Sequence, residues 1–207
     1  MPKDFDIKNG FARYIHIVLK KVNPEAQIDA HAMNNVNRML HHAMAKIIEQ
    51  DLVLKGDRKT YSARDVQAAV QLALPTGIAK FAVKAGIDAM FEYTTNTGVR
   101  NAADRAKLVI PPPLVKRTLR NRLSRARTQI GETAPVYLAG ALEWLTADIL
   151  DRSAEAAMER KKTHRISPKD IALAISNDVE LQIFFDGVLN GGVTNPLFRN
   201  TGKYVML

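Results

Sequence analysis

A six-residue pattern occurs twice in this chain, 105 residues apart, and it limits the folds open to the protein. YSARDV begins at Tyr61 and ISPKDI begins at Ile166. In both copies the serine can cap a helix by accepting hydrogen bonds from the free N–H groups of the first turn. The aspartate three residues later suits the positive end of the helix dipole. The repeat therefore predicts two related units, each with a helix that starts in the same way.

Each unit has the same predicted order of helices: short, long, short. In the first unit, apolar residues at positions 15, 18, 19 and 22 follow helical spacing until Asn23-Pro24 ends the short helix. In the second unit, Pro168 stands in a first turn, where its missing N–H would be unpaired anyway. The remaining predicted helices are 30–54 and 63–74 in the first unit, and 114–123, 134–160 and 168–176 in the second.

The long helices predict that the two units pack on each other. Apolar residues form a stripe along the first long helix, and a short–long–short trio cannot bury this stripe alone: Met33, Val36, Leu40, Met44 and Ile47. Two trios that cross at their long helices can bury it. The connection around 95–100 is short and polar, and it raises the effective concentration of one unit near the other to about the millimolar range or above. We therefore expect an all-α fold in which two units pair head to tail within one chain.

The formal net charge is +9, and most of it lies in one central stretch. Residues 98–128 hold nine basic side chains and one acidic side chain, a net charge of +8, whereas residues 1–97 carry +3 and residues 129–207 carry −2. Such a concentrated basic segment indicates a polyanionic partner, with nucleic acid first and an anionic membrane second. The alternative is a basic surface that is merely solvated.

The residues of both units resemble histones. The first unit resembles histone two-B in FARYIHIVLKKVNPEAQIDAHAM and in RKTYSARDVQAAVQLALPTGIAKFAVKAGIDAMFEYTTN. The second is similar to histone two-A in APVYLAGALEWLTADIL, KKTHRISPKDIALAISNDVEL and GGVTNPLF. The resemblance covers about residues 8–198. A two-B-like half followed by a two-A-like half is similar to the histone doublets of giant viruses of the Marseillevirus group.

The resemblance implies two histone folds that pair as an intramolecular pseudo-heterodimer. It predicts a two-B-like fold with a C-terminal helix over 1–97, a short basic connector over 98–107, and a two-A-like fold with a C-terminal docking segment over 108–207. The implied function is that of a structural chromatin protein. It would bind and wrap double-stranded DNA without sequence preference, in a nucleosome-like particle that compacts a viral genome.

The resemblance also implies partners and a location. The expected partners are histones three and four, as another doublet met through a four-helix contact of the first half, and a second copy of the chain within the particle. The expected location is the virion and the infected host cell, in its nucleus or a viral factory. For a cellular protein it would be the nucleus and chromosome.

Three DNA-binding sites along one edge are implied by the family: the two short helices at the centre and a pair of loops at each end. Basic side chains there bind phosphates, and an arginine enters the minor groove of the DNA wherever that groove faces the protein. Lys116, Arg117 and Arg120 fall on one side of their predicted helix, away from Val115 and Leu119. The expected DNA-binding residues are Lys20, Arg58, Lys59, Thr60, Lys116, Arg117, Arg120, Arg125, Arg127, Thr163 and Arg165.

The chain departs from the family pattern at two sites. Leu114 stands where an arginine is expected, after the triple proline 111–113. This site should therefore bind DNA more weakly. The family's acidic patch, which docks basic segments of partners, is diluted because Gly77, Ala85 and Val179 stand where acids are expected. The acidic-patch residues expected here are Glu143, Asp148, Asp151, Asp178 and Glu180.

Other classes of function fit the sequence less well. The chain has no cysteine, its five histidines form no i, i+4 pair, and it has no HExxH motif or glycine-rich phosphate loop. We therefore expect that the protein is not an enzyme and that it binds no metal, cofactor or small-molecule substrate. No apolar run is long enough to cross a membrane, and no aromatic platform for RNA is evident. The nearest alternative is a histone-fold transcription factor or transcription-complex subunit, although such proteins tend to lose the loop arginines or the docking tail.

Overall fold

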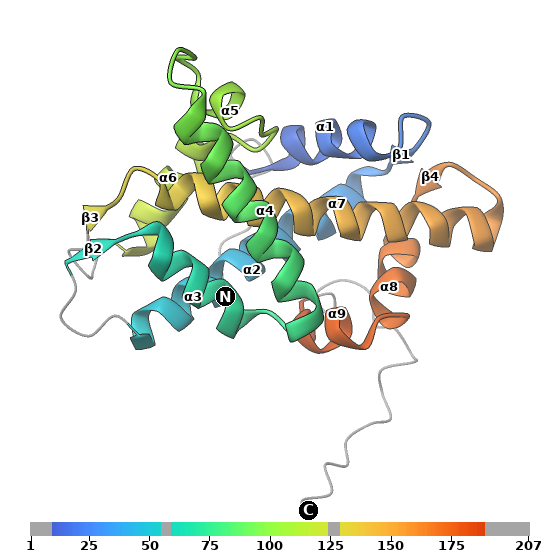
Figure 1. Cartoon of the computed structure of the whole chain (residues 1–207). Helices are drawn as coiled ribbons and strands as arrows, with labels where there is room; N and C mark the ends of the chain where they lie inside the picture. The colour runs from blue at the N-terminus through green and yellow to red at the C-terminus, as the bar shows by residue number, and fades with distance from the viewer. Residues whose placement is uncertain (1–9, 55–58, 124–128, 189–207) are drawn as a thin grey trace, which may run out of the picture.

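The structure is a computed structural model that describes residues 10–54, 59–123 and 129–188 (Figure 1). These residues are mainly helical, and none of the described helices is both long and apolar enough to span a membrane. The elements in chain order are α1 (Ala12–Val22), β1 (Gln27–Ile28), α2 (Ala30–Leu54), β2 (Thr60–Tyr61), α3 (Ala63–Ala73), α4 (Thr76–Thr95), α5 (Ala102–Arg105), α6 (Pro112–Leu123), β3 (Gln129–Ile130), α7 (Ala134–Lys161), β4 (Arg165–Ile166), α8 (Pro168–Ser176) and α9 (Val179–Phe184).

The predicted helices are present, with small differences at their ends. Helix α2 covers the predicted range, and α7 runs one residue further than predicted. Helix α6 begins two residues early, at Pro112, because prolines fit the first turn of a helix. Helix α3 ends at Ala73, since Leu74 precedes Pro75 and a residue before proline avoids the helical conformation.

The repeated pattern forms the same N-terminal cap in both units. The backbone N–H of Ser62 donates to Asp65 Oδ2 at 2.8 Å, and that of Ser167 donates to Asp170 Oδ2 at 2.8 Å. In the second copy Arg160 also donates to Asp170, with Nε 2.6 Å from Oδ1. Burial by itself would raise the pKa of the Asp170 carboxyl, but the bonds from Ser167 and Arg160 outweigh it and hold this pKa below its ordinary value.

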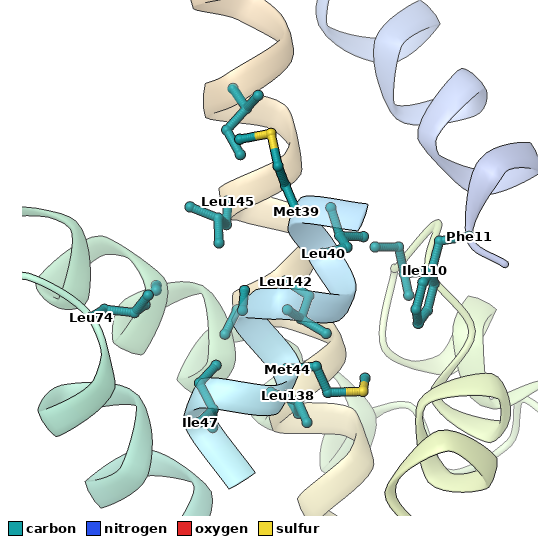
Figure 2. Packing of buried hydrophobic residues seen from close by; sticks show 14 of the residues in the cluster. Phe11, Met39, Leu40, Met44, Ile47, Leu74, Ile110, Leu138, Leu142 and Leu145 are labelled. Atoms are coloured by element: carbon teal, nitrogen blue, oxygen red, sulfur yellow. The ribbon is translucent and has the colours of Figure 1, made fainter. Parts of the chain in front are cut away.

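The two units share one continuous hydrophobic core, as predicted. Leu40 and Met44 of α2 lie in the same cluster as Leu138, Leu142 and Leu145 of α7, at the centre of this core (Figure 2). Each long helix therefore buries its apolar stripe against the other unit. Since burial of a large aliphatic side chain contributes about 1.5–3 kcal/mol, neither unit would keep this stabilisation alone.

Helix α4 makes the most extensive contact between the halves, because it crosses in front of α7 (Figure 1). The two helices approach closely at glycines. A Cβ atom added at Gly140 would lie 2.7 Å from both the carbonyl oxygen of Ala85 and the Cβ of Ala89. A Cβ at Gly86 would lie 2.5 Å from the ring of Tyr137. The glycines thus let the two helix backbones touch.

The segment between the halves is ordered and packs on the end of α4. It contains the short helix α5, and the Arg105 guanidinium lies 3.9 Å from the centre of the Tyr93 ring. Lys107 pairs with Glu92 at 2.9 Å between Nζ and Oε2. These two contacts hold the connection against the end of α4.

Candidate nucleic-acid interface

The first loop of the first unit lies beside the second loop of the second unit. Strands β1 and β4 pair in parallel, with Gln27 opposite Arg165. The backbone N–H of Gln27 donates to His164 O at 2.7 Å. The Arg165 side chain is exposed, and its backbone N–H donates to Thr163 Oγ1 at 3.3 Å. This arrangement presents one predicted arginine and one predicted threonine at the surface of a fixed loop pair.

The other two loops meet at the opposite end of the long helices. Strands β2 and β3 pair in parallel, with Thr60 opposite Gln129, and the N–H of Gln129 donates to Lys59 O at 2.8 Å. Lys59 and Thr60 are both exposed. The predicted residues Arg58, Arg125 and Arg127 lie outside the described residues.

Helix α6 has the two faces that its sequence predicts. Val115 and Leu119 are fully buried, whereas Arg117 and Arg120 are exposed and Lys116 is half-buried. The basic side chains therefore point away from the core. A helix with this division can present cations to a phosphate backbone without giving up its packing.

Lys20 has a local structural role in addition to its charge. Its Nζ donates to the carbonyl oxygens of Pro24 at 2.9 Å and Ala26 at 2.8 Å, in the loop that leads into β1. Lys20 thus orders the loop that supports the β1–β4 pair, close to the end that carries Arg165. Sequence spacing shows no sign of these bonds, because they depend on how the chain turns after α1.

Two further arginines join the basic surfaces. Arg13 is exposed on α1, and Arg122 is exposed on the last turn of α6. Burial, with a smaller contribution from Arg122, lowers the pKa of His41 from 6.5 to about 4. The helical spacing of Arg13, His16 and Lys20 could have indicated the outer face of α1, since residues three and four apart lie on one side.

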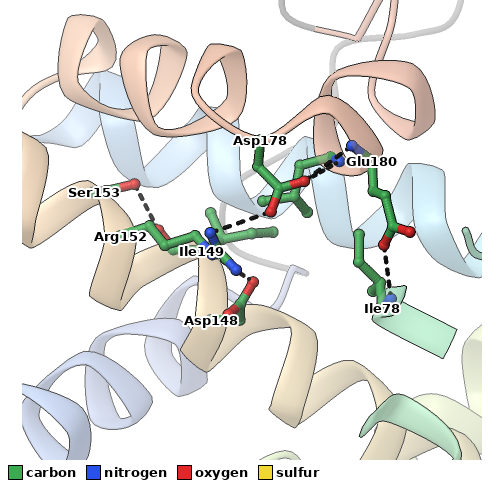
Figure 3. A network of polar contacts seen from close by, with 8 residues as sticks. Ile78, Asp148, Ile149, Arg152, Ser153, Asp178 and Glu180 are labelled. Atoms are coloured by element: carbon green, nitrogen blue, oxygen red, sulfur yellow. Dashed lines mark hydrogen bonds and ion pairs between the residues drawn. The ribbon is translucent and has the colours of Figure 1, made fainter. Parts of the chain in front are cut away.

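The predicted acidic patch is largely engaged in contacts within the chain. Glu143 is buried and accepts the backbone N–H groups of Val109 at 2.7 Å and Ile110 at 2.9 Å. Glu180 accepts those of Gly77 and Ile78, both at 2.9 Å, at the start of α4 (Figure 3).

The two aspartates beside them flank one arginine. Arg152 lies 3.0 Å from Asp148 and 3.1 Å from Asp178, so two predicted patch residues share one cation (Figure 3). Asp178 also caps α9 through the N–H groups of its first turn. Asp151 is exposed. Contacts within the chain therefore hold four of the five predicted patch residues: Glu143, Asp148, Asp178 and Glu180.

Comparison with known proteins identifies the family. Histone H2B.v1 of Dictyostelium discoideum, a histone two-B, is 28% identical over 206 residues, covering 90% of this chain and 91% of that protein. A histone two-A of Lodderomyces elongisporus is 39% identical over 119 residues, covering 56% of this chain and 87% of its own length. The chain belongs to the histone family. A macro-type histone two-A of Capsaspora owczarzaki is 43% identical over 93 residues, covering 45% of this chain and 24% of that relative. No protein-family model matches.

Both kinds of histone are represented within this one chain. Similarity to a two-B relative extends over nearly the whole chain, and similarity to two-A relatives extends over about half of it. Together with the shared core, these matches make the protein an all-α histone-fold doublet. The expected fold is confirmed. The assignment of single residues to DNA contacts remains a prediction.

Proposed function

We propose that this histone doublet binds the backbone of double-stranded DNA without sequence preference and wraps it in a nucleosome-like particle. The observation that carries the proposal is the pair of parallel loop contacts at opposite ends of the long helices. Each contact joins one loop of each half and leaves basic or hydroxyl side chains exposed. The basic face of α6 adds a further surface.

The proposed contacts are those of phosphate recognition. Arg165 and Thr163 would act at one end, with Lys20 supporting the loop, and Lys59 and Thr60 would act at the other. Cationic side chains and hydroxyls on fixed backbone hold phosphates regardless of base sequence. The remaining proposed contacts are Lys116, Arg117 and Arg120 on α6, together with Arg58, Arg125 and Arg127 outside the described residues.

We further propose that histones three and four, as another doublet, complete the particle through the first half. Val53 near the end of α2 is 81% exposed and Leu72 near the end of α3 is 58% exposed. These side chains would be covered in a four-helix contact. The particle would hold two copies of this chain. The role is structural and non-enzymatic, consistent with a family of structural proteins.

The order of a two-B-like half before a two-A-like half supports a viral setting, similar to the doublets of the Marseillevirus group. The genome compacted would then be viral, and the protein would be found in the virion and in the infected cell. For a cellular host the nucleus and chromosome are the proposed location. The proposed units are 1–97, 98–107 and 108–207, and α5 falls within the second of these.

The test has a binding arm and a wrapping arm. In the binding arm, fluorescence anisotropy with mixed-sequence duplex should give a log–log salt slope of about −0.9 per neutralised phosphate. Arg165→Ala should make this slope shallower by about 0.9 and weaken binding to all sequences alike. Lys80→Ala, the matched control, removes one exposed charge from α4 and should leave the slope unchanged.

The wrapping arm is nuclease protection with a histone three–four partner and mixed-sequence DNA. Discrete protected fragments that require both proteins are expected. A flat salt response would contradict the electrostatic contacts. Protection of one particular sequence only, or none beyond that of the partner alone, would favour the transcription-complex alternative.

A further inference from the structure

Helix α4 has an outer face whose composition is not explained by the fold or by DNA binding. Its inner face packs on α7 through Ala82, Gly86 and Ala89. On the outer face Phe81 is 49% exposed and Phe91 is 66% exposed. Two large aromatic side chains are therefore exposed on this helix face, ten residues apart, with charged residues between them.

The outer face has the spacing of a helix-pairing seam. Phe81, Lys84, Asp88 and Phe91 follow one another at intervals of three, four and three residues, and all four are exposed. This is the a/d spacing of a heptad repeat, which brings residues to one line along a helix. The aromatic residues stand at the two ends of the seam, and the charged pair lies between them.

The seam is symmetric about the level of residue 86. When a second copy of the helix lies antiparallel against it, residues whose numbers add to 172 face each other. Phe81 then faces Phe91 of the other copy, and Lys84 faces Asp88 of the other copy. Each contact occurs twice, as in any isologous twofold interface. By the same rule Ile87, which is 45% exposed, would face Ala85 of the other copy.

Of the side chains of the seam, one is already held in place and two carry charges that form no ion pair among the described residues. The Phe81 ring is stacked on Trp144 of α7, with ring centres 5.5 Å apart and 18° between their planes, so its position is held before binding. Among the described residues, neither Lys84 nor Asp88 takes part in an ion pair. Pairing between copies would neutralise both charges and bury both aromatic residues.

We propose that α4 is a self-association surface, through which two copies of this doublet pair antiparallel by the seam Phe81, Lys84, Asp88 and Phe91. The contact needs no DNA and is separate from the two copies proposed within one particle. A single helix pair makes a small interface, so the free proteins should associate weakly. Two such surfaces on one particle would strengthen contacts between neighbouring particles by avidity.

Charge reversal on the full-length chain tests the proposal by sedimentation velocity without DNA, over a concentration series reaching the high-micromolar range. Lys84→Asp places two acids opposite two acids, and Asp88→Lys places two lysines opposite two lysines. Each variant alone should weaken self-association by about tenfold or more, because repulsion replaces both attractive pairs. An equimolar mixture of the two variants should associate again, since every acid then faces a lysine.

The controls separate this effect from unfolding or from net charge. Lys169→Asp reverses an exposed lysine on α8 and should self-associate like the unchanged protein. Circular dichroism and thermal melting should show that all variants fold, because the altered side chains are exposed. The proposal is overturned if the unchanged protein stays monomeric, which would point to a different protein as the occupant of this face. It is equally overturned if Lys84→Asp associates as before or if the mixture fails to recover. None of these outcomes bears on DNA binding.

Discussion

Gly140→Ala should loosen the crossing of α4 and α7 on which the doublet depends. The new Cβ would lie 2.7 Å from the carbonyl oxygen of Ala85 and from the Cβ of Ala89, so a backbone must move. Alanine favours a helix over glycine by about 1 kcal/mol, which opposes the effect. Overpacking of a closely packed core costs about 1–3 kcal/mol, and a backbone obstacle places this case towards the upper end. We expect a net loss of about 1–2 kcal/mol in the free energy of unfolding.

The assay is urea and thermal unfolding followed by circular dichroism. For a chain of this length, the expected loss corresponds to a fall in Tm of about 2–8 °C. The urea midpoint should fall with an unchanged slope, because the unfolded surface is the same. Gly98→Ala is the control, since a Cβ there meets no atom within 4 Å. A Gly140→Ala protein as stable as the unchanged chain would refute the idea that the glycine is required for close helix contact.

Three further substitutions test other contacts. Glu143→Ala would leave the two backbone N–H groups ahead of α6 without their buried acceptor, and denaturant unfolding should show a loss of about 2–4 kcal/mol. Asp170→Asn should cost about 1–3 kcal/mol at neutral pH by weakening the bond to Arg160. Because the pKa of Asp170 lies below its ordinary value in the fold, its contribution to stability is present at neutral pH and is lost as pH falls below about 4. The free energy of unfolding of the variant should therefore change less with pH in that range than that of the unchanged protein. Burial keeps His41 neutral with a pKa of about 4, so the unfolded chain takes up its proton first and stability should fall between pH 6.5 and 4. His41→Phe, which keeps a ring against Phe11, should remove that part of the pH dependence, and an unchanged pH profile would show that another group is responsible.

Local signals in the sequence predict the short–long–short helices of each unit, their order and their caps. Amphipathic spacing, the Asn23-Pro24 stop and the two Ser-x-x-Asp caps are local signals, and local hydrogen bonding and sterics are enough to interpret them. The same spacing correctly placed Arg117 and Arg120 on the outer side of α6. Pairing of the halves also followed, since an apolar stripe on a long helix needs a partner.

Which acidic side chains remain available to a partner depends on the tertiary structure. Glu143, Glu180, Asp148 and Asp178 look alike in sequence, yet the first two hold backbone N–H groups and the last two share Arg152. Helical i, i+4 spacing could have paired Asp148 with Arg152, but the partners of Glu143, Glu180 and Asp178 are far away in the chain, so no spacing rule predicts them.

The outer face of α4 depends on tertiary structure in the same way. Its symmetric seam is present in the sequence, but the packing of the opposite side on α7 determines that the seam faces outward. The physical reason is range: the backbone conformation of a helix depends on neighbours within one turn, whereas the exposure and pairing of a side chain depend on whatever the fold brings next to it.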